Sequence, residues 1–224
     1  MKYFVLPVLI GSLLLFAPLT ARAVPTAAEM NRIQNATTIF DQMPAIIPPY
    51  VLQHAQGIAV IPGVLKAGFI FGGELGKGIM VARLPNGGWS APSFISLAGA
   101  SFGFQIGGEI RNVVLIFNTP EAVAAAASGN LKLGVGASVT AGPVGAGIGA
   151  NTEMPAVYSY VSSAGAFIGA TVKGSVLSTD YDANSNVYGM ANPLSMSARA
   201  APGLARNFVC VISRSTGAPT RVCS

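Results

Sequence analysis

Glycine recurs through the long uncharged segments of this chain, and this pattern limits the folds that those segments can adopt. The sequence contains 27 glycines, and residues 133–152 carry no charged side chain. The apolar residues there and just before alternate with small or hydroxyl residues, which is the period of a β-strand. A membrane-spanning helix is excluded, because glycine and proline at this density would leave its backbone groups unpaired. The pattern therefore predicts a sheet.

The first 23 residues have the organisation of a secretory signal peptide. The segment MKYFVLPVLIGSLLLFAPLTARA begins with a lysine, continues as an apolar run and ends in a small-x-small pattern at residues 21–23. The alternative is a retained membrane helix, but the run is short for a span and is interrupted by Pro7 and Pro18. We therefore predict cleavage before Val24 and an exported protein. Its expected location is the periplasm or the exterior of the cell, and peripheral attachment to the envelope membrane is one alternative.

Two helices are predicted from their first residues. Thr26-Ala27-Ala28-Glu29 forms a capping box, and apolar side chains follow it at helical spacing across residues 24–43. We expect this amphipathic helix to dock on the body of the protein, with a membrane surface as the alternative. Thr119-Pro120-Glu121 is typical of a second helix start, which an alanine run continues to Ser128.

From Gly57 onward the sequence is typical of strands. GIAVIP is apolar throughout, and residues 69–73 and 78–84 are predicted to form two further strands with glycines turning the chain between them. Asn-Gly within residues 85–88 predicts a hairpin. Four more strands are expected, at residues 101–110, 112–117, 131–140 and 166–174.

The triplet Gly-Gly-Glu occurs at residues 72–74 and again at 107–109, each time before an apolar strand and near a base, Lys77 or Arg111. Two similar hairpins explain this echo. The elements together predict an α+β fold: a strongly bent, mainly antiparallel sheet, for which a barrel is one form, with the N-terminal helix and the short alanine-rich helix packed on it. We expect a signal peptide (1–23), the helix (24–43), one domain (44–190) and a C-terminal tail (191–224).

The chain has two cysteines, Cys210 and Cys223, both close to its C-terminus. In an exported protein they are expected to form a disulfide. The ring of about 14 residues would stabilise the fold by about 3 kcal/mol in the chain-entropy model. A metal site would need further ligands, and a redox pair would need Cys-x-x-Cys spacing. We therefore expect the disulfide to hold down an appended tail.

Three short motifs imitate nucleotide or catalytic sites but lack necessary parts. FGGELGKG has Phe71 in place of the first P-loop glycine, and Gly78 in place of the Ser or Thr after the lysine. GASFG imitates a nucleophile elbow around Ser101, but the one histidine, His54, precedes it. GAGIGA has no acidic residue about twenty positions further on. We therefore predict no catalytic residue, no nucleotide and no cofactor.

The segment STDYDANSNVYG places oxygen-bearing side chains at alternate positions, as calcium loops do. These are Asp180, Asp182, Asn184 and Asn186. Ser185 stands where an EF-hand has glycine, and no glutamate closes the loop. The main prediction is a polar turn rich in side-chain to backbone hydrogen bonds, with a calcium site as the alternative.

Charge is sparse and slightly basic. Without Lys2 and Arg22, which leave with the predicted signal peptide, 11 basic residues face 8 acidic ones, for a net charge of +3. Binding to nucleic acid usually needs lysine and arginine clustered on one face. The sequence therefore gives no indication of a nucleic-acid partner.

Several long motifs, in the same order, resemble the SYLF domain, a module of yeast and animal endocytic adaptors, plant proteins and exported bacterial proteins. They are IPPYVLQHAQGIAVIPGVLKAGFIFGGELGKGIMVAR, GGWSAPSFISLAGASFGFQIGGE, KLGVGASVTAGPVGAG, Tyr-Ser-Tyr at 158–160 and GSVLSTDYDANSNVYG. The resemblance implies a binding module rather than an enzyme, with affinity for phosphoinositides and other anionic lipids and, in some members, for actin filaments. His54, Gln56 and residues 161–165 stand where the family often has basic residues.

We therefore predict an exported module that associates with anionic phospholipid. The candidate headgroup contacts are Lys66, Lys77, Arg83, Arg111, Lys132 and Lys173. Each base near an anionic surface contributes about 1 kcal/mol, so a net +3 would need an apolar contribution from the N-terminal helix. Actin is not expected as a partner of an exported protein. The alternative is a structural or protein-interaction role without lipid binding.

Overall fold

The structure is a computed structural model and describes residues 24–68, 71–102, 107–129, 131–144, 154–163, 166–169, 172 and 174–223. The predicted signal peptide, GAGIGA and Lys173 lie outside the described residues. The helices are α1 (Ala27–Asp41), η1 (Met43–Ala45), α2 (Pro49–His54), α3 (Pro120–Ala127), α4 (Tyr181–Tyr188), η2 (Ala198–Ala200) and α5 (Gly203–Thr216). The strands are β1 (Gly57–Gly68), β2 (Phe71–Ala82), β3 (Ser93–Phe102), β4 (Gly107–Phe117), β5 (Leu131–Lys132), β6 (Val139–Ala141), β7 (Val157–Ser163), β8 (Ala166–Gly169) and β9 (Val176–Thr179).

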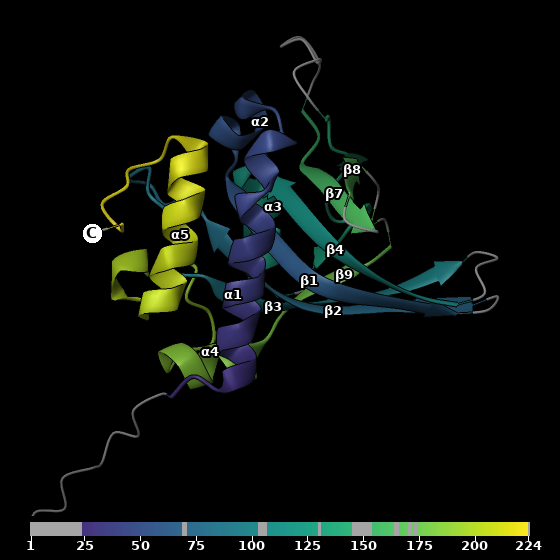
Figure 1. Cartoon of the computed structure of the whole chain (residues 1–224), viewed down its shortest axis with the longest axis horizontal. Coiled ribbons are helices and arrows are strands. Elements are labelled where there is room, and N and C mark those ends of the chain that lie inside the picture. The colour runs from purple at the N-terminus through teal and green to yellow at the C-terminus, as the bar shows by residue number, and fades with distance from the viewer. Residues whose placement is uncertain are drawn as a thin grey trace, which may run out of the picture.

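The described strands form one curled sheet (Figure 1). Their order is β5-β9-β3-β2-β1-β4-β7-β6, and β8 pairs with β7. β6 and β7 run parallel, whereas the other pairs are antiparallel. The sheet bends into a half-barrel. The predicted α+β class and the strongly bent, mainly antiparallel sheet are therefore confirmed.

A bulge in β1 contributes to the bend. Val60 and Leu65 are five positions apart, whereas their partners on β2, Ile79 and Leu75, are four positions apart. β1 therefore carries one extra residue, and an extra residue bends a strand and increases its twist. Gly63 lies within this bulge with a φ of 59°, a value that favours glycine.

β2 is one continuous strand, which corrects the prediction of two strands separated by a glycine turn. Two of its glycines lie against the bulge of β1. A methyl group at Gly76 would lie 2.7 Å from the side chains of Ile61 and Val64, and one at Gly78 would overlap the backbone oxygen of Val60. These glycines allow a close approach between neighbouring strands and do not turn the chain.

Three other predicted strands are divided differently in the structure. Residues 101–110 belong to the end of β3 and the start of β4, with 103–106 outside the described residues. Residues 131–140 are broken by a turn at Gly134, whose φ is 85°, so Val135 is 77% exposed instead of sharing the buried face. Within residues 166–174, the described strand β8 ends at Gly169.

Several local predictions are confirmed. At the hairpin of residues 85–88, the amide of Leu84 donates to the carbonyl oxygen of Gly88 over 2.8 Å. Thr119 caps α3 by accepting a hydrogen bond from the amide of Ala122 over 3.2 Å. The strand at residues 112–117 is buried from Val113 to its end. Each of these features depends on residues that are close in sequence.

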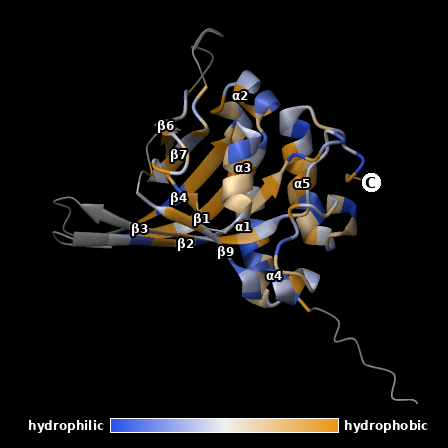
Figure 2. Cartoon of the chain, turned by 180° about the vertical axis from the view of Figure 1, so that it is seen from behind, coloured by the Kyte–Doolittle hydropathy of each residue, from blue (hydrophilic) through white to orange (hydrophobic). Residues whose placement is uncertain are grey.

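Alternate residues of the sheet face two separate apolar cores. The first core lies under α1, α2, α4 and α5 and includes Ile58 and Val114. The second core lies on the opposite face, where α3 packs, and includes Ile61 and Val113. Figure 2 shows the hydrophobic residues concentrated in β1 and β4 within the body.

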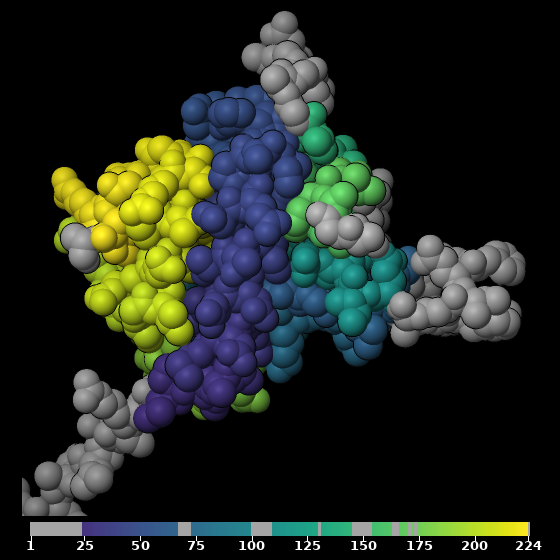
Figure 3. Space-filling view, viewed as in Figure 1, coloured from purple at the N-terminus to yellow at the C-terminus, as the bar shows by residue number. Residues whose placement is uncertain are grey.

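α1 and α5 lie side by side over the first core (Figure 3). The predicted capping box of α1 is present, since Thr26 and Glu29 exchange hydrogen bonds between side chain and backbone. Ile33, Ala36 and Phe40 are buried against the body. The prediction that this helix docks on the body is confirmed, and its apolar face is already in use.

The C-terminal segment is part of the body, which corrects the prediction of an appended tail. Phe208 of α5 is fully buried, and its ring meets that of Phe40 edge-on with centroids 6.4 Å apart. The predicted disulfide joins Cys210 within α5 to Cys223 beyond it. No helix in the described part of the chain is long and apolar enough to cross a membrane.

Candidate functional site

Strands β3, β2, β1 and β4 continue beyond α1 as a projecting four-stranded ribbon, here residues 65–68, 71–77, 96–102 and 107–111 (Figure 1). β1 lies between the two Gly-Gly-Glu triplets, and both Glu74 and Glu109 stand opposite Lys66. The repeated Gly-Gly-Glu triplet therefore lies on two strands, β2 and β4, that flank β1 and pair with the same residues of it.

One face of the ribbon exposes large apolar side chains. Leu65 stands opposite Leu75 on β2 and opposite Ile110 on β4, so the three form a row across the strands. The exposed fractions are 65% for Leu75, 48% for Leu65 and 71% for Ile110. Exposed apolar patches of this kind are typical of binding surfaces. We call these three residues the apolar row.

A groove of about 650 Å³ lies between α1 and the apolar row. α1 lines it with Asn31 and Arg32, and the ribbon lines it with Leu65, Leu75 and Lys77. The groove therefore combines an apolar surface with two cationic side chains. That combination suits a ligand with an apolar part and a negatively charged part.

Asp180 holds both cations of the groove. Its carboxylate lies 3.0 Å from the Arg32 guanidinium and 3.3 Å from the Lys77 ammonium. Partial burial alone raises the pKa of Asp180, but hydrogen bonds from Arg32 and the Ala183 amide, with the charges of Arg32 and Lys77, outweigh it and lower the pKa. Asp180 is therefore ionised at neutral pH, and the three side chains carry a net charge of +1. Lys77 remains 65% exposed.

Asp180 also begins α4, so the predicted polar turn is a capped helix. The oxygens of Asp180 accept hydrogen bonds from Arg32 and the Ala183 amide, and the fully buried Asn184 accepts one from the Phe94 amide. The oxygens that a calcium ion would require are thus already bonded within the protein. Asp182 is exposed, and Asn186 donates to Glu29. Among the described residues, no three His, Cys, Asp or Glu side chains are grouped as metal ligands.

On the opposite face of the ribbon, Glu74 accepts hydrogen bonds from Arg111 and Ser175. Glu74 is 4% exposed, so this ion pair is largely removed from water. The sequence suggested Lys77 as the base near Glu74, but Lys77 lies on the other face of β2. The ion pair instead joins the two Gly-Gly-Glu strands across β1.

The predicted headgroup contacts do not form one patch. Lys77 borders the groove, Arg111 is paired on the opposite face, Lys66 is half-buried beside Glu74, and Lys132 is exposed on β5. Arg83 lies over Trp89, 4.5 Å from the ring centroid, and donates to the Ala55 carbonyl oxygen. Burial lowers the pKa of Arg83.

Sequence reasoning therefore found one groove residue, Lys77, and missed the others. Arg32 lies within the predicted amphipathic helix of residues 24–43, where nothing distinguishes it from the other polar residues, and the apolar row emerges only when three strands are aligned. The one available signal was the alternation of Leu75 with the glycines and charged residues around it. His54, exposed at the end of α2, has its Nδ1 2.7 Å from the Tyr50 carbonyl oxygen.

Comparison with known proteins gives consistent matches. Residues 98–203 match the family described as "Ysc84: Las17-binding protein actin regulator". Protein YSC84 of Saccharomyces cerevisiae is 46% identical over 150 residues, which are 64% of this chain and 32% of that protein. SH3 domain-containing YSC84-like protein 1 of Homo sapiens is 43% identical over 166 residues, which are 72% of this chain and 48% of that protein.

The same-named protein of Xenopus laevis is 45% identical over 148 residues, covering 64% of this chain and 44% of that protein. The matched region thus spans between a third and a half of these relatives. The range matched by the family model begins within β3 and ends at the start of α5, so α1, β1 and β2 lie outside that range. The chain belongs to the Ysc84 (SYLF) family.

Proposed function

We propose that this protein is a non-enzymatic binding module that associates with anionic phospholipid through the groove between α1 and the ribbon. The observation that carries the proposal is the apolar row beside Lys77 and Arg32. The apolar row provides contacts for acyl chains, and the two cations provide contacts for a phosphate group. The apolar contribution comes from the ribbon, because the apolar face of α1 is buried in the body.

The expected free energies support a weak, reversible association. Burying one leucine side chain contributes about 2 kcal/mol, and a lysine near an anionic surface contributes about 1 kcal/mol. Two or three side chains of the apolar row therefore contribute more than the net charge of the groove. We expect a preference for anionic vesicles with only moderate sensitivity to salt.

Export belongs to the same proposal. The first 23 residues have the organisation of a signal peptide, and the expected location is the periplasm or the exterior, at the envelope membrane. The test is expression of the whole chain with determination of the N-terminal residue of the recovered protein. A mature protein that begins at Val24 supports export, and retention of Met1 or its immediate neighbours contradicts it.

A second candidate function is suggested by the relatives. The family description names Las17 binding and actin regulation, and the yeast and vertebrate relatives carry these or related names. A protein partner could use the same apolar row, since large exposed apolar side chains also mark protein interfaces. Under this alternative the protein binds actin filaments or an actin-regulating protein and has no affinity for vesicles.

Co-sedimentation separates the two candidates. The chain from Val24 is mixed with phosphatidylglycerol vesicles, phosphatidylcholine vesicles or actin filaments, at low and high salt. We expect recovery with phosphatidylglycerol vesicles, about tenfold weaker binding for Leu75→Ser and about fivefold weaker binding for Lys77→Gln. The matched controls, Val135→Ser and Lys132→Gln, change exposed residues outside the groove. Equal recovery in the supernatant with both vesicle types contradicts lipid binding, and recovery with filaments alone supports the second candidate.

A further inference from the structure

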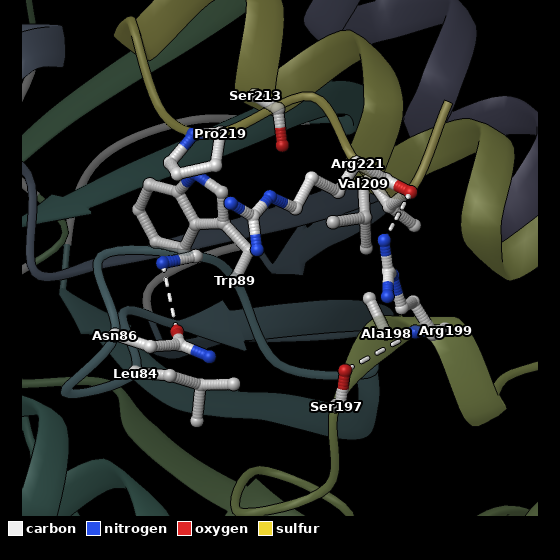
Figure 4. A pocket seen from close by; sticks show the side chains of 12 residues that line it. Leu84, Asn86, Trp89, Ser197, Ala198, Arg199, Val209, Ser213, Pro219 and Arg221 are labelled. Carbon is white, nitrogen blue, oxygen red and sulfur yellow. Dashed lines mark hydrogen bonds between the residues drawn. The ribbon is translucent and has the colours of Figure 1, made fainter. Parts of the chain in front are cut away.

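A second pocket, separate from the groove, lies where the 84–89 hairpin, η2, α5 and the C-terminal segment meet (Figure 4). Its volume is about 280 Å³, and it shares no lining residue with the groove. Its size suits a small molecule better than a macromolecular segment. The pocket plays no part in the function proposed above.

One side of the pocket is apolar and held in place. Trp89 is 3% exposed, and its indole N–H donates to the hydroxyl oxygen of Thr216 over 3.1 Å. Leu84, Val209 and Pro219 add to the apolar lining. A fixed aromatic ring with aliphatic neighbours is a suitable surface for the hydrocarbon part of a small ligand.

The pocket is also cationic. Arg199 and Arg221 line it, and none of its described lining residues is acidic. Arg199 donates to the backbone oxygen of Arg221 over 3.3 Å, which orients its side chain along the pocket. Figure 4 shows the Arg221 side chain reaching across the pocket toward Trp89. Guanidinium groups recognise carboxylates and phosphates through paired N–H donors.

A buried hydroxyl group in the lining has no partner within the described chain. Ser213 is 1% exposed, and its Oγ makes no hydrogen bond. Buried hydroxyl groups are rarely left without a partner, because the lost hydrogen bond with water costs about 1–3 kcal/mol. Figure 4 shows this oxygen directed into the pocket. A ligand oxygen would satisfy it.

The disulfide fixes the remaining wall. Cys223 directly follows Val222, which lines the pocket together with Pro219 and Arg221, and it is bonded to Cys210 of α5. The segment that carries Arg221 is therefore tethered to the helix that carries Ser213. This covalent link keeps the Arg221 segment and Ser213 at the same pocket.

We propose that this pocket binds a small organic acid: a carboxylate that meets the arginines and the Ser213 hydroxyl, attached to a compact apolar body that packs on Trp89. Both halves of the pocket are needed for this ligand class. A purely inorganic anion leaves the apolar wall uncovered, and a neutral aromatic molecule offers no oxyanion to Arg199 or to the Ser213 hydroxyl.

Trp89 is the one tryptophan of the chain, so its fluorescence reports on this pocket directly. The chain from Val24 is titrated with three ligands. Benzoate carries both a negative charge and an apolar ring, inorganic phosphate carries only the charge, and benzyl alcohol carries only the ring. We expect a saturable change with benzoate at an affinity at least tenfold tighter than with either of the others. No saturable change with benzoate, or equal affinity for benzyl alcohol, would falsify the proposal.

Variants assign the binding to the pocket. Arg199→Gln should weaken benzoate binding about tenfold and Ser213→Ala about fivefold, in line with the loss of a charge-assisted and a neutral hydrogen bond. Arg206→Gln is the matched control, since Arg206 is exposed on α5 and does not line the pocket. Arg199 is exposed, so its variant should fold normally, and circular dichroism checks this. If Arg199→Gln and Arg206→Gln weakened benzoate binding equally, the loss of affinity would follow from net charge alone, and the assignment to the pocket would be overturned.

Discussion

The two ends of strands β1 and β2 are built alike but covered differently. At the body end, Ile58 and Val81 are partners on the face beneath the helices, and both are fully buried. At the ribbon end, Leu65 and Leu75 are partners on the same face of the same strands, and both are exposed. The comparison shows that the cover supplied by α1 and α5, rather than the strand sequence, decides whether an apolar pair becomes core or binding surface.

The largest expected effect comes from removing a covering side chain. Phe208→Ala should lower the free energy of unfolding by about 3–5 kcal/mol, because it leaves a cavity between α5 and α1. Leu75→Ala at the ribbon should change it by less than about 0.5 kcal/mol. Urea denaturation of both variants measures the difference. If both variants lost a similar amount of unfolding free energy, Leu75 and the ribbon would belong to the cooperatively folded core.

A smaller effect is expected from the glycines of β2. Gly78→Ala places a methyl group against the backbone of the β1 bulge and should cost about 2 kcal/mol. The control is Gly73→Ala, in the ribbon part of the same strand, where a methyl group would meet its nearest described neighbour at an ordinary 3.7 Å. Thermal unfolding compares the two variants. If Gly73→Ala proved as damaging as Gly78→Ala, the packing of the bulge would not explain why glycine is needed.

The smallest effect is expected at the boundary between body and ribbon. Asp180→Asn keeps an N-cap for α4 but weakens the contacts with Arg32 and Lys77, at a cost of about 1 kcal/mol near neutral pH. Because the folded-state pKa of Asp180 is lowered, its contribution is present above the unfolded pKa of about 3.9 and is lost as pH falls through the folded pKa. The difference between wild type and variant should therefore shrink below about pH 4.

Denaturation at pH 7 and at pH 3 measures this change. A difference that grows toward acid pH would contradict the direction of the pKa shift. Asp180→Ala, which removes the cap as well, should be about 1 kcal/mol less stable than Asp180→Asn at both pH values.

Features set by neighbouring residues were predictable from the sequence. Thr26 and Glu29 are three positions apart and define a helix start by themselves, and Asn-Gly defines the hairpin at residues 85–88. The glycines of β2 were misinterpreted, because a turn glycine and a glycine beneath a bulge look alike until the neighbouring strand is placed. Likewise, nothing near α5 in sequence indicates that Phe208 packs on Phe40.

The candidate site was predictable only in part, because its residues are far apart in sequence and meet only in the folded chain. Lys77 could be named from its position, but its partner Asp180 lies beyond seven further described strands, and Arg32 is 148 positions from Asp180. The apolar row depends on register between three strands, and a shift of one residue would turn it to the opposite face. The second pocket joins a hairpin to a helix more than 120 positions later.

The position of α5 late in the chain has a consequence for biosynthesis. A polypeptide leaves the ribosome from its N-terminus, so the sheet is complete before residues 203–216 emerge. Until then the strand face that α5 shares with α1 lacks the cover of α5, so the first core is incomplete. Such a delay would keep the newly made chain loose during any transfer that requires an unfolded polypeptide.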